Sequence, residues 1–337
     1  MRDKLYTSVE PGLEIEVQAG LEQVEDLLGQ SVRSARDLTD QLTRHLAQAG
    51  GKRLRPMLTL IAAQLGAPHR MQSEEVIQAA AAMELTHLAS LYHDDVMDSA
   101  DSRRGVESAQ RIWGNNAAIL AGDVLFSRAS LLVAGLGQES VIFHAKTFER
   151  LCMGQLNETF GPAQGDDPVD FYLQVLADKT GSLVATSAYF GAVHSGAGRE
   201  VAEMTRNFGE SVGVAFQLAD DVIDIVSPGD VTGKTPGTDL REGVDTMPVL
   251  LLRRHQAEGE LDAEGQRILA LLDGDLSSDQ ALAEVVEALS VHPVIDETRA
   301  LARQWADEAV GYLAELPDSE AKDALEAFAM LMVDRAA

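Results

Sequence analysis

Two short acidic sequences are the segments of this chain best suited to catalysis. Residues 94–98 (DDVMD) and 220–224 (DDVID) share the pattern DDxxD, and each ends an apolar stretch with helical periodicity. Residues four positions apart lie on one face of a helix, so the first and last aspartate of each motif stack over one another. Like charges at this spacing destabilise a helix, and more so where water is partly excluded. Two such motifs in one chain therefore predict bound cations.

Mg²⁺ is the cation that these carboxylates favour. It takes oxygen ligands, keeps several waters, and is bound by one or two carboxylates together with substrate phosphates. Histidine and cysteine are too sparse near both motifs to favour zinc. The alternative is that each motif is a solvated acidic helix end. One motif would leave that alternative open, whereas two, each preceded by an apolar helix, argue for a metal site.

Four basic clusters stand out in a chain with 54 acidic and 27 basic residues. Taken singly, each is explained as surface charge. Together with two magnesium sites they supply cations for two diphosphates, one bound through metal and one directly by arginine and lysine. The two glycines of the first cluster can also form a helix C-cap and turn, which exposes N–H groups to anions. The clusters are residues 50–56 (GGKRLRP), 101–105 (DSRRG), 179–181 (KTG) and 233–235 (GKT).

Composition excludes several classes of protein. The formal net charge of −27 argues against nucleic acid as a partner and against a membrane held by headgroup charge. The single cysteine, Cys152, allows no intrachain disulfide or cysteine-based metal site, and its apolar surroundings predict a core residue. We find no signal peptide at the start and no run of about 18 apolar residues that would span a bilayer. A cytoplasmic location is therefore expected.

The elements that must position these motifs are helices, because helical periodicity recurs along the chain and no strand pattern is convincing. Ser73 is expected to cap one helix and Pro168 to open another. Breaks are expected at 50–51, 99–114, 161–165 and 227–243. We predict one all-α domain covering residues 1–337. The expected helices are 13–48, 54–66, 73–97, 115–135, 138–160, 168–194, 198–226, 244–256, 262–272, 278–290, 294–315 and 318–335.

Five segments, in the order in which they occur, resemble the conserved regions of the trans-isoprenyl diphosphate synthases, or polyprenyl synthetases. They are GGKRLRP, HDDVMDSADSRRG, KTGS, FQLADDVID and GKTPGTDLREG. The resemblance covers roughly residues 40 to 250. It implies a bundle of antiparallel helices around a deep central cavity, usually as a homodimer. It also implies a prenyltransferase that condenses an allylic diphosphate with isopentenyl diphosphate.

The resemblance also implies a role for individual residues. It implies that the ligands of three Mg²⁺ ions, which hold the allylic diphosphate across the cavity, are Asp94, Asp98 and Asp220. The residues that it implies as supports close to these ligands are Asp95, Asp221 and Asp224. As the residues that hold isopentenyl diphosphate, it implies Lys52, Arg55, His87 and Arg104. As contacts to the allylic diphosphate, it implies Arg103, Lys179 and Lys234.

Two positions need separate comment. His87 could be a hydrogen-bonded core histidine, but it lies two turns before Asp94 on the same helix face, which favours the ligand role. Many relatives have Arg-Glu-Gly-Lys where this chain has Val244 in place of the lysine. A charge at the lid of the active site is therefore expected to be absent.

The reaction breaks a C–O bond, so that diphosphate leaves and an allylic cation forms. Metal ions, lysine and arginine stabilise the charge on the leaving group. By the resemblance, oxygens of Thr180 and Gln217, near the Lys179 carbonyl, stabilise the cation. Water must be excluded, because hydrolysis competes. No side chain is an obvious base, so we expect the departed diphosphate to take the proton that isopentenyl diphosphate loses.

Product length is set by the depth of an apolar tunnel before the first motif. The inward residues there are small, so nothing bulky blocks a growing chain, which predicts a hexaprenyl to decaprenyl product. The alternative is that a larger residue, Met83, Phe126, Phe143, Phe148 or Met153, closes the tunnel deeper down and gives geranylgeranyl or farnesyl diphosphate. The small residues are Ser90, Ala89, Thr86, Ala82 and Ala81.

Three other classes are less consistent with the sequence. A class I terpene cyclase shares the first DDxxD motif, but its second motif is of an Asn/Ser/Glu type and its pocket is rich in aromatic residues. A non-catalytic partner subunit usually lacks one acidic motif. A helical scaffold does not explain five ordered motifs. The sequence leaves open a weak peripheral membrane contact for release of an apolar product.

Overall fold

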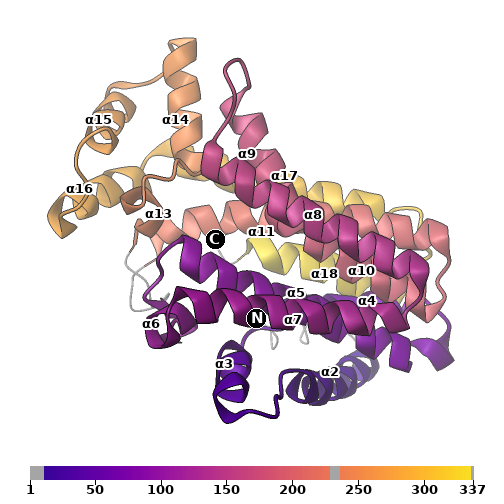
Figure 1. The fold of residues 1–337 in the computed structure, drawn as a ribbon. Helices are drawn as coiled ribbons and strands as arrows, with labels where there is room; N and C mark the ends of the chain where they lie inside the picture. The colour runs from indigo at the N-terminus through magenta and orange to yellow at the C-terminus, as the bar shows by residue number, and fades with distance from the viewer. Residues whose placement is uncertain (1–10, 228–235, 335–337) are drawn as a thin grey trace. The chain divides into compact units, whose positions relative to one another are not determined.

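The computed structural model describes residues 11–227 and 236–334, and its regular elements are almost all α-helices (Figure 1). The prediction of an all-α fold is confirmed. Within the described residues, the chain divides into two compact units. Unit 1 comprises Met1–Arg150, Ser182–Glu210 and Val310–Phe328, and unit 2 comprises Leu151–Gly181, Ser211–Ala309 and Ala329–Ala337. One domain over the whole chain stays a prediction.

Unit 1 is organised around helix α5 (Glu74–Met97), which packs against α2, α4, α7 and α10. The run of small residues 79–82 in α5 is fully buried, so neighbouring helices approach closely. Gly122 of α7 lies against α5, and a side chain there would overlap the ring of His93. The other elements of this unit are α2 (Pro11–Ser31), α3 (Asp37–Gln48), α4 (Leu54–Ala63), η1 (Pro68–Arg70), β1 (Ser102–Arg103), β2 (Val106–Glu107), α6 (Ala109–Trp113), α7 (Asn115–Gly135) and α10 (Ser182–Ser195).

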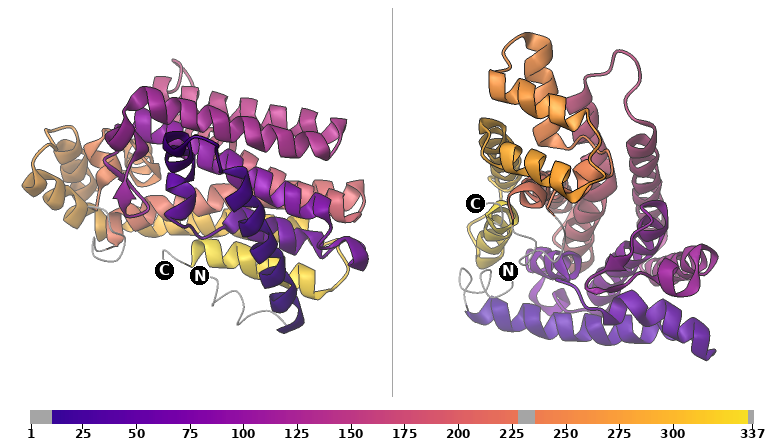
Figure 2. Two further views of the ribbon diagram at one scale, coloured as in Figure 1. Left: turned by 60° about the horizontal axis from the view of Figure 1, so that its bottom comes forward. Right: turned by 90° about the vertical axis from the view of Figure 1, so that its left-hand side faces the viewer.

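Unit 2 contains the second acidic motif and a core of its own. Leu218 and Val222 of α11 are buried in this core together with Met247 and Leu252 of α14. Figure 2 shows α14, α15 and α16 in orange as one group of short helices. The elements of this unit are α9 (Pro168–Leu176), the π-helical η2 (Ala177–Gly181), α13 (Thr238–Arg241), α14 (Met247–Glu258), α15 (Ala263–Leu272) and α16 (Asp279–Ser290). The helices that contribute residues to both units are α8 (Gln138–Phe160), α11 (Arg199–Val226), α17 (Pro293–Tyr312) and α18 (Glu320–Val333).

Helix starts follow the sequence where capping chemistry is local. The Ser73 side chain accepts a hydrogen bond from the Val76 N–H, so Ser73 caps α5 as predicted. Asp167 caps α9 by accepting from the N–H groups of Val169 and Asp170, and Pro168 occupies the first turn.

Four sequence predictions about elements and burial were wrong. The expected helix 13–48 is broken after Ser31, where the Ser34 N–H donates to Asp40 and the Thr43 hydroxyl to the Val32 carbonyl. The expected break 99–114 contains a two-strand hairpin and α6, and the expected break 227–243 contains α13. Cys152 was expected in the core but is exposed on α8.

Helix α7 is more apolar than was expected from the sequence. By length and composition it could cross a membrane, which contradicts the statement that no segment is apolar enough. In the fold it packs along α5 (Figure 1). The side chains of Ile119, Leu120 and Leu131 are exposed. Only 33% of its most apolar window is buried, so α7 presents an apolar face that residues 11–227 and 236–334 leave largely uncovered.

Candidate active site

The first acidic motif forms the C-terminal end of α5, and its aspartates face different surroundings. Asp94 is half-buried and Asp98, the C-cap residue, is exposed. Asp95 is fully buried, and its Oδ1 accepts a hydrogen bond from Arg103 Nε at 2.7 Å. Burial raises the pKa of Asp95, and Arg103 opposes the shift. The other carboxylate oxygen of Asp95 is buried without a hydrogen-bond partner.

The second acidic motif repeats this division on α11. Asp220 and Asp224 are half-buried, whereas Asp221 is 5% exposed. The Asp221 carboxylate accepts from the Tyr172 hydroxyl, at 3.2 Å to Oδ1 and 3.1 Å to Oδ2, and from the Met247 N–H at 3.1 Å. Burial raises the pKa of Asp221 well above its usual value, although the Met247 N–H acts in the opposite direction.

A cluster of cations surrounds one buried carboxylate in unit 1. Glu84 of α5 is 1% exposed and accepts from Arg53 Nη1 at 2.8 Å, and its Oε1 lies 3.9 Å from Arg104 Nη2. Burial lowers the pKa of Arg55 to about 10, against the attraction of Glu84, and the buried Nε of Arg55 has no hydrogen-bond partner. Burial, and then Arg55 and Arg104, hold the pKa of His87 well below its usual value. The cluster therefore has positive charge available for an anion.

Backbone geometry fixes Arg104 in this cluster. Arg104 and Gly105 both have positive φ and form the turn between β1 and β2. The Arg104 guanidinium donates to the carbonyls of Leu46 and Gly50. Gly51 has φ +149°, and a Cβ there would lie 2.9 Å from the guanidinium carbon of Arg104. The turn at 50–51 therefore provides both the space and the carbonyl groups that hold Arg104.

The KTG cluster lies in the π-helical segment η2. Lys179 Nζ forms an ion pair with Glu158 Oε2 of α8 at 2.5 Å. Gly154 of α8 and Gly213 of α11 pack against the backbone of η2, where side chains would clash. A π-helical turn is uncommon and is found at functional sites. The glycines allow two helices to hold this turn from both sides.

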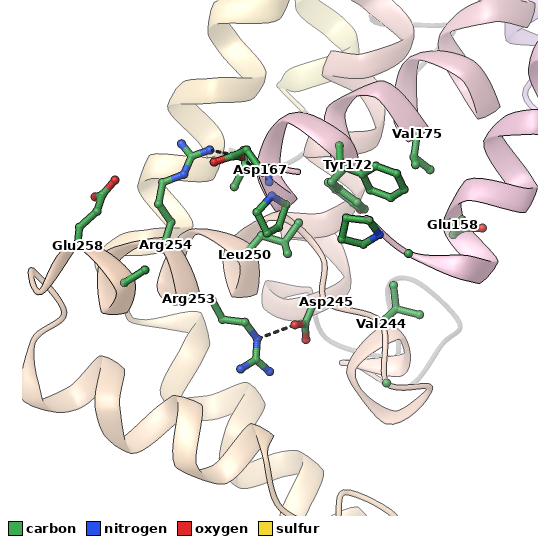
Figure 3. A pocket seen from close by; sticks show the side chains of 17 residues that line it. Glu158, Asp167, Tyr172, Val175, Val244, Asp245, Leu250, Arg253, Arg254 and Glu258 are labelled. Atoms are coloured by element: carbon green, nitrogen blue, oxygen red, sulfur yellow. Dashed lines mark hydrogen bonds and ion pairs between the residues drawn. The ribbon is translucent and has the colours of Figure 1, made fainter. Parts of the chain in front are cut away.

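Unit 2 also contains a cavity of about 800 Å³ beside α9 (Figure 3). Tyr172 and Val175 of α9, Leu250 of α14, and Val244 line it. Its charged lining residues are largely paired. Arg253 lies 2.6 Å from Asp245, and Arg254 lies 3.2 Å from Asp167. No aspartate of the second motif lines this cavity. Val244, which replaces a lysine of many relatives, adds an apolar wall here.

The carboxylates of the two acidic motifs are the candidate ligands for Mg²⁺. In residues 11–227 and 236–334, no group of three or more His, Cys, Asp or Glu side chains is assembled as a closed metal site. The accessible pairs Asp94/Asp98 and Asp220/Asp224 provide oxygen ligands only. Such open pairs fit Mg²⁺, which keeps waters and takes substrate phosphate oxygens to complete its shell.

The predicted site residues divide between the two units, and their roles stay predictions. Lys52 is exposed, and Lys234 lies outside the described residues. Sequence analysis missed Glu84, Glu158 and Tyr172. Only Glu84 carried a signal, because it is a carboxylate within an apolar helical run. The predicted residues in unit 1 are Lys52, Arg55, His87, Asp94, Asp95, Asp98, Arg103 and Arg104, and those in unit 2 are Lys179, Thr180, Gln217, Asp220, Asp221 and Asp224.

Comparison with known proteins gives consistent matches. A family described as Polyprenyl synthetase matches residues 36–289. The chain is 43% identical over 319 residues to a nonaprenyl diphosphate synthase of Mycobacterium tuberculosis, covering 95% of this chain and 93% of that protein. It is 30% identical to an octaprenyl diphosphate synthase of Escherichia coli, covering 88% and 90%. A geranylgeranyl pyrophosphate synthase of Corynebacterium glutamicum, solved with calcium and isoprenyl diphosphate, matches with a TM-score of 0.84, 41% identity, and coverage of 97% and 98%.

Proposed function

This chain belongs to the polyprenyl synthetase family, and we infer that it is a prenyltransferase that extends an allylic diphosphate with isopentenyl diphosphate in the presence of Mg²⁺. One observation carries the inference: both DDxxD motifs bury the second aspartate and leave the first and last accessible as a pair of oxygen ligands. A solvated acidic helix end does not need that arrangement.

In this proposal Asp94, Asp98 and Asp220 would hold the metal, as three ions per active site, and Asp224 would support these ligands. When bound, magnesium supplies positive charge that stabilises the leaving diphosphate. Lys179, released from Glu158, binds the allylic diphosphate from unit 2. In the structure this ammonium is paired with Glu158, so binding the diphosphate exchanges one anionic partner for another.

Unit 1 supplies the site for isopentenyl diphosphate. Arg55, Arg104 and the exposed Lys52 bind this diphosphate through charge-assisted hydrogen bonds. Burial lowers the pKa of Arg55 and of Arg104, because both cations are removed from water. A bound anion would compensate for the lost hydration. His87 is neutral before the substrate binds and donates one ring N–H to it. Thr180 and Gln217 present oxygens to the allylic cation, and the departed diphosphate takes the proton.

The test is incubation with labelled isopentenyl diphosphate, each allylic starter in turn, and Mg²⁺, followed by chain-length analysis of the products. We expect elongation with at least one starter, and its loss when EDTA is added. Asp94→Asn and Asp220→Asn variants should each lose most of the activity. Absence of elongation with every starter, in folded protein with Mg²⁺, would refute the proposed function.

We propose a long-chain product, as the similarity to nonaprenyl and octaprenyl diphosphate synthases supports. A specific observation favours geranylgeranyl diphosphate as the second candidate. The ring of Phe126 stacks on Phe148 at 3.7 Å and on His144 at 5.5 Å, and His144 hydrogen-bonds the buried Thr86. Chain lengths of the wild type and of Phe126→Ala distinguish the two: an aromatic floor predicts a longer product from the variant.

We also propose that the enzyme is a homodimer in which a second copy covers α7. Ile119, Leu120 and Leu131 are 41%, 62% and 71% exposed, which is a large apolar face for a protein of this charge. Leu120→Glu with Leu131→Glu should give a monomer by light scattering, whereas Leu38→Glu, at an exposed leucine on α3, should not. A wild-type monomer would contradict the dimer.

We propose a cytoplasmic location with a weak membrane contact for release of the apolar product. The net charge of −27 supports this, because headgroup attraction cannot hold such a protein on an anionic surface. Cell fractionation with and without product-forming substrates tests it. Protein found in the membrane fraction after a high-salt wash would contradict the proposal.

A further inference from the structure

Asp221 is the point where three elements of unit 2 are tied together. Its carboxylate belongs to α11, its N–H donor Met247 begins α14, and its hydroxyl donor Tyr172 belongs to α9. Among these partners, only Tyr172 reaches Asp221 through a side chain. Removing the Tyr172 hydroxyl would therefore leave the backbone of α11 and α14 tied, while α9 loses its polar link to the motif.

The position of Tyr172 along the chain gives this link a consequence. Tyr172 precedes the π-helical segment by about one turn, and that segment carries Lys179 and Thr180. Tyr172 lines the 800 Å³ cavity (Figure 3), and its hydroxyl donates to Asp221, which is not among the lining residues. Burial, and then Asp221, raise the pKa of Tyr172 well above its usual value, so the hydroxyl keeps its proton as a donor.

We propose that Tyr172 is a positioning residue for the reaction. Through Asp221 it fixes the register of α9 and η2 against α11, and so sets where the Lys179 ammonium stands relative to the carboxylates of Asp220 and Asp224. The inference rests on the proposed function, since it assigns these groups to one diphosphate and its metal. A residue that merely fills space would not distinguish between the two substrates.

The test is Tyr172→Phe, which keeps the ring that lines the cavity and removes the hydroxyl. We expect the Mg²⁺ concentration for half-maximal activity to rise about tenfold, the low end of what loss of an outer partner costs a metal site. The KM for the allylic diphosphate should rise, while the KM for isopentenyl diphosphate, bound in unit 1, stays within about twofold. Tyr312→Phe, at an exposed tyrosine on α17, is the matched control.

A binding measurement separates this inference from the proposed function. Isothermal titration calorimetry with inorganic diphosphate and Mg²⁺ should show about tenfold weaker binding in Tyr172→Phe than in the wild type or Tyr312→Phe. This readout holds whether or not the wild type elongates a prenyl chain. Inactive wild-type protein refutes the proposed function, whereas unchanged Mg²⁺ dependence and unchanged binding in Tyr172→Phe refute only the positioning role.

A double-mutant cycle with Asp221→Asn tests the route of the effect. If Tyr172 acts through Asp221, the hydroxyl deletion should have at most a twofold effect on calorimetric binding in the Asp221→Asn background. If the double variant weakens binding by the full product of the two single-variant effects, Tyr172 acts independently of Asp221, and the inference is overturned. Equal rises in both KM values with a lowered melting temperature would do the same, because they indicate general loosening.

Discussion

Replacement of Glu84 by glutamine is the most informative perturbation of unit 1. Glu84 is buried and pairs with Arg53 at 2.8 Å, and the neighbouring guanidiniums of Arg104 and Arg55 depend on the same charge. Truncating one partner of a buried ion pair costs about 3–5 kcal/mol. Glutamine keeps the shape and one acceptor oxygen, and Arg53 retains Glu25, so we expect a loss of about 2 kcal/mol.

The loss should be visible as a lower melting temperature. With an unfolding entropy of about 2.1 cal/mol/K per residue, a loss of about 2 kcal/mol lowers the midpoint of a 337-residue chain by roughly 3 °C, so Glu84→Gln should melt about 3 °C below the wild type. Glu22→Gln, at an exposed position of α2, is the control and should melt within about 1 °C of the wild type.

The same variant should bind inorganic diphosphate more tightly than the wild type. Removal of the Glu84 carboxylate removes its repulsion of an anion and leaves the positive charge of Arg55 and Arg104 less compensated, so the cluster attracts diphosphate more strongly. Ligand binding to the folded state raises stability with ligand concentration, so the melting deficit should shrink as diphosphate is added. A variant that melts with the wild type, or that diphosphate stabilises less than the wild type, would refute this account of the cluster.

Three further predictions concern single positions. Ala89→Phe puts a ring at a buried position of α5, so the product should shorten on chain-length analysis, and an unchanged product would refute the placement of the tunnel. Burial lowers the pKa of His144 to about 4 from 6.5, so its contribution of about 3 kcal/mol is present above pH 6.5 and lost as the pH falls towards 4. His144→Gln should therefore flatten the melting temperature against pH in that window. Gly51→Ala forces a Cβ towards Arg104 and should raise the KM for isopentenyl diphosphate more than that for the allylic substrate.

The sequence predicted those features that depend on neighbours in the chain. Ser73 and Pro168 mark helix starts because capping involves residues within one turn. The pairing of first and last aspartates in each motif follows from helical spacing alone. The prediction of one long helix over 13–48 was wrong because local hydrogen bonds stabilise a break in it. The Ser34 N–H donates to the Asp40 side chain and the Thr43 hydroxyl donates to the Val32 carbonyl, so these groups are paired without a helix. Hydrophobic periodicity does not reveal such bonds.

Residues that matter through long-range contacts could not be found in this way. Tyr172 is 49 positions from Asp221, and Lys179 is 21 positions from its partner Glu158. In sequence, Tyr172 is one more apolar residue of an amphipathic helix. The exposure of Cys152 and of the α7 face has the same origin, since an apolar stretch predicts burial without saying which chain covers it.

The buried second aspartate explains how an apolar helix tolerates three acids at its end. Successive residues point about 100° apart, so the second aspartate lies on a different side of the helix from the first and last, and in both motifs that side is buried. The buried carboxylate has different partners in the two units: Asp95 accepts a hydrogen bond from the cation of Arg103, whereas Asp221 accepts from two neutral donors, the Tyr172 hydroxyl and the Met247 N–H. Burial raises the pKa of both, which shows that neither environment fully replaces water. Each inward carboxylate thus ties its helix end to a second element, and this tie is what allows the outer pair to be held in place for a cation despite mutual repulsion.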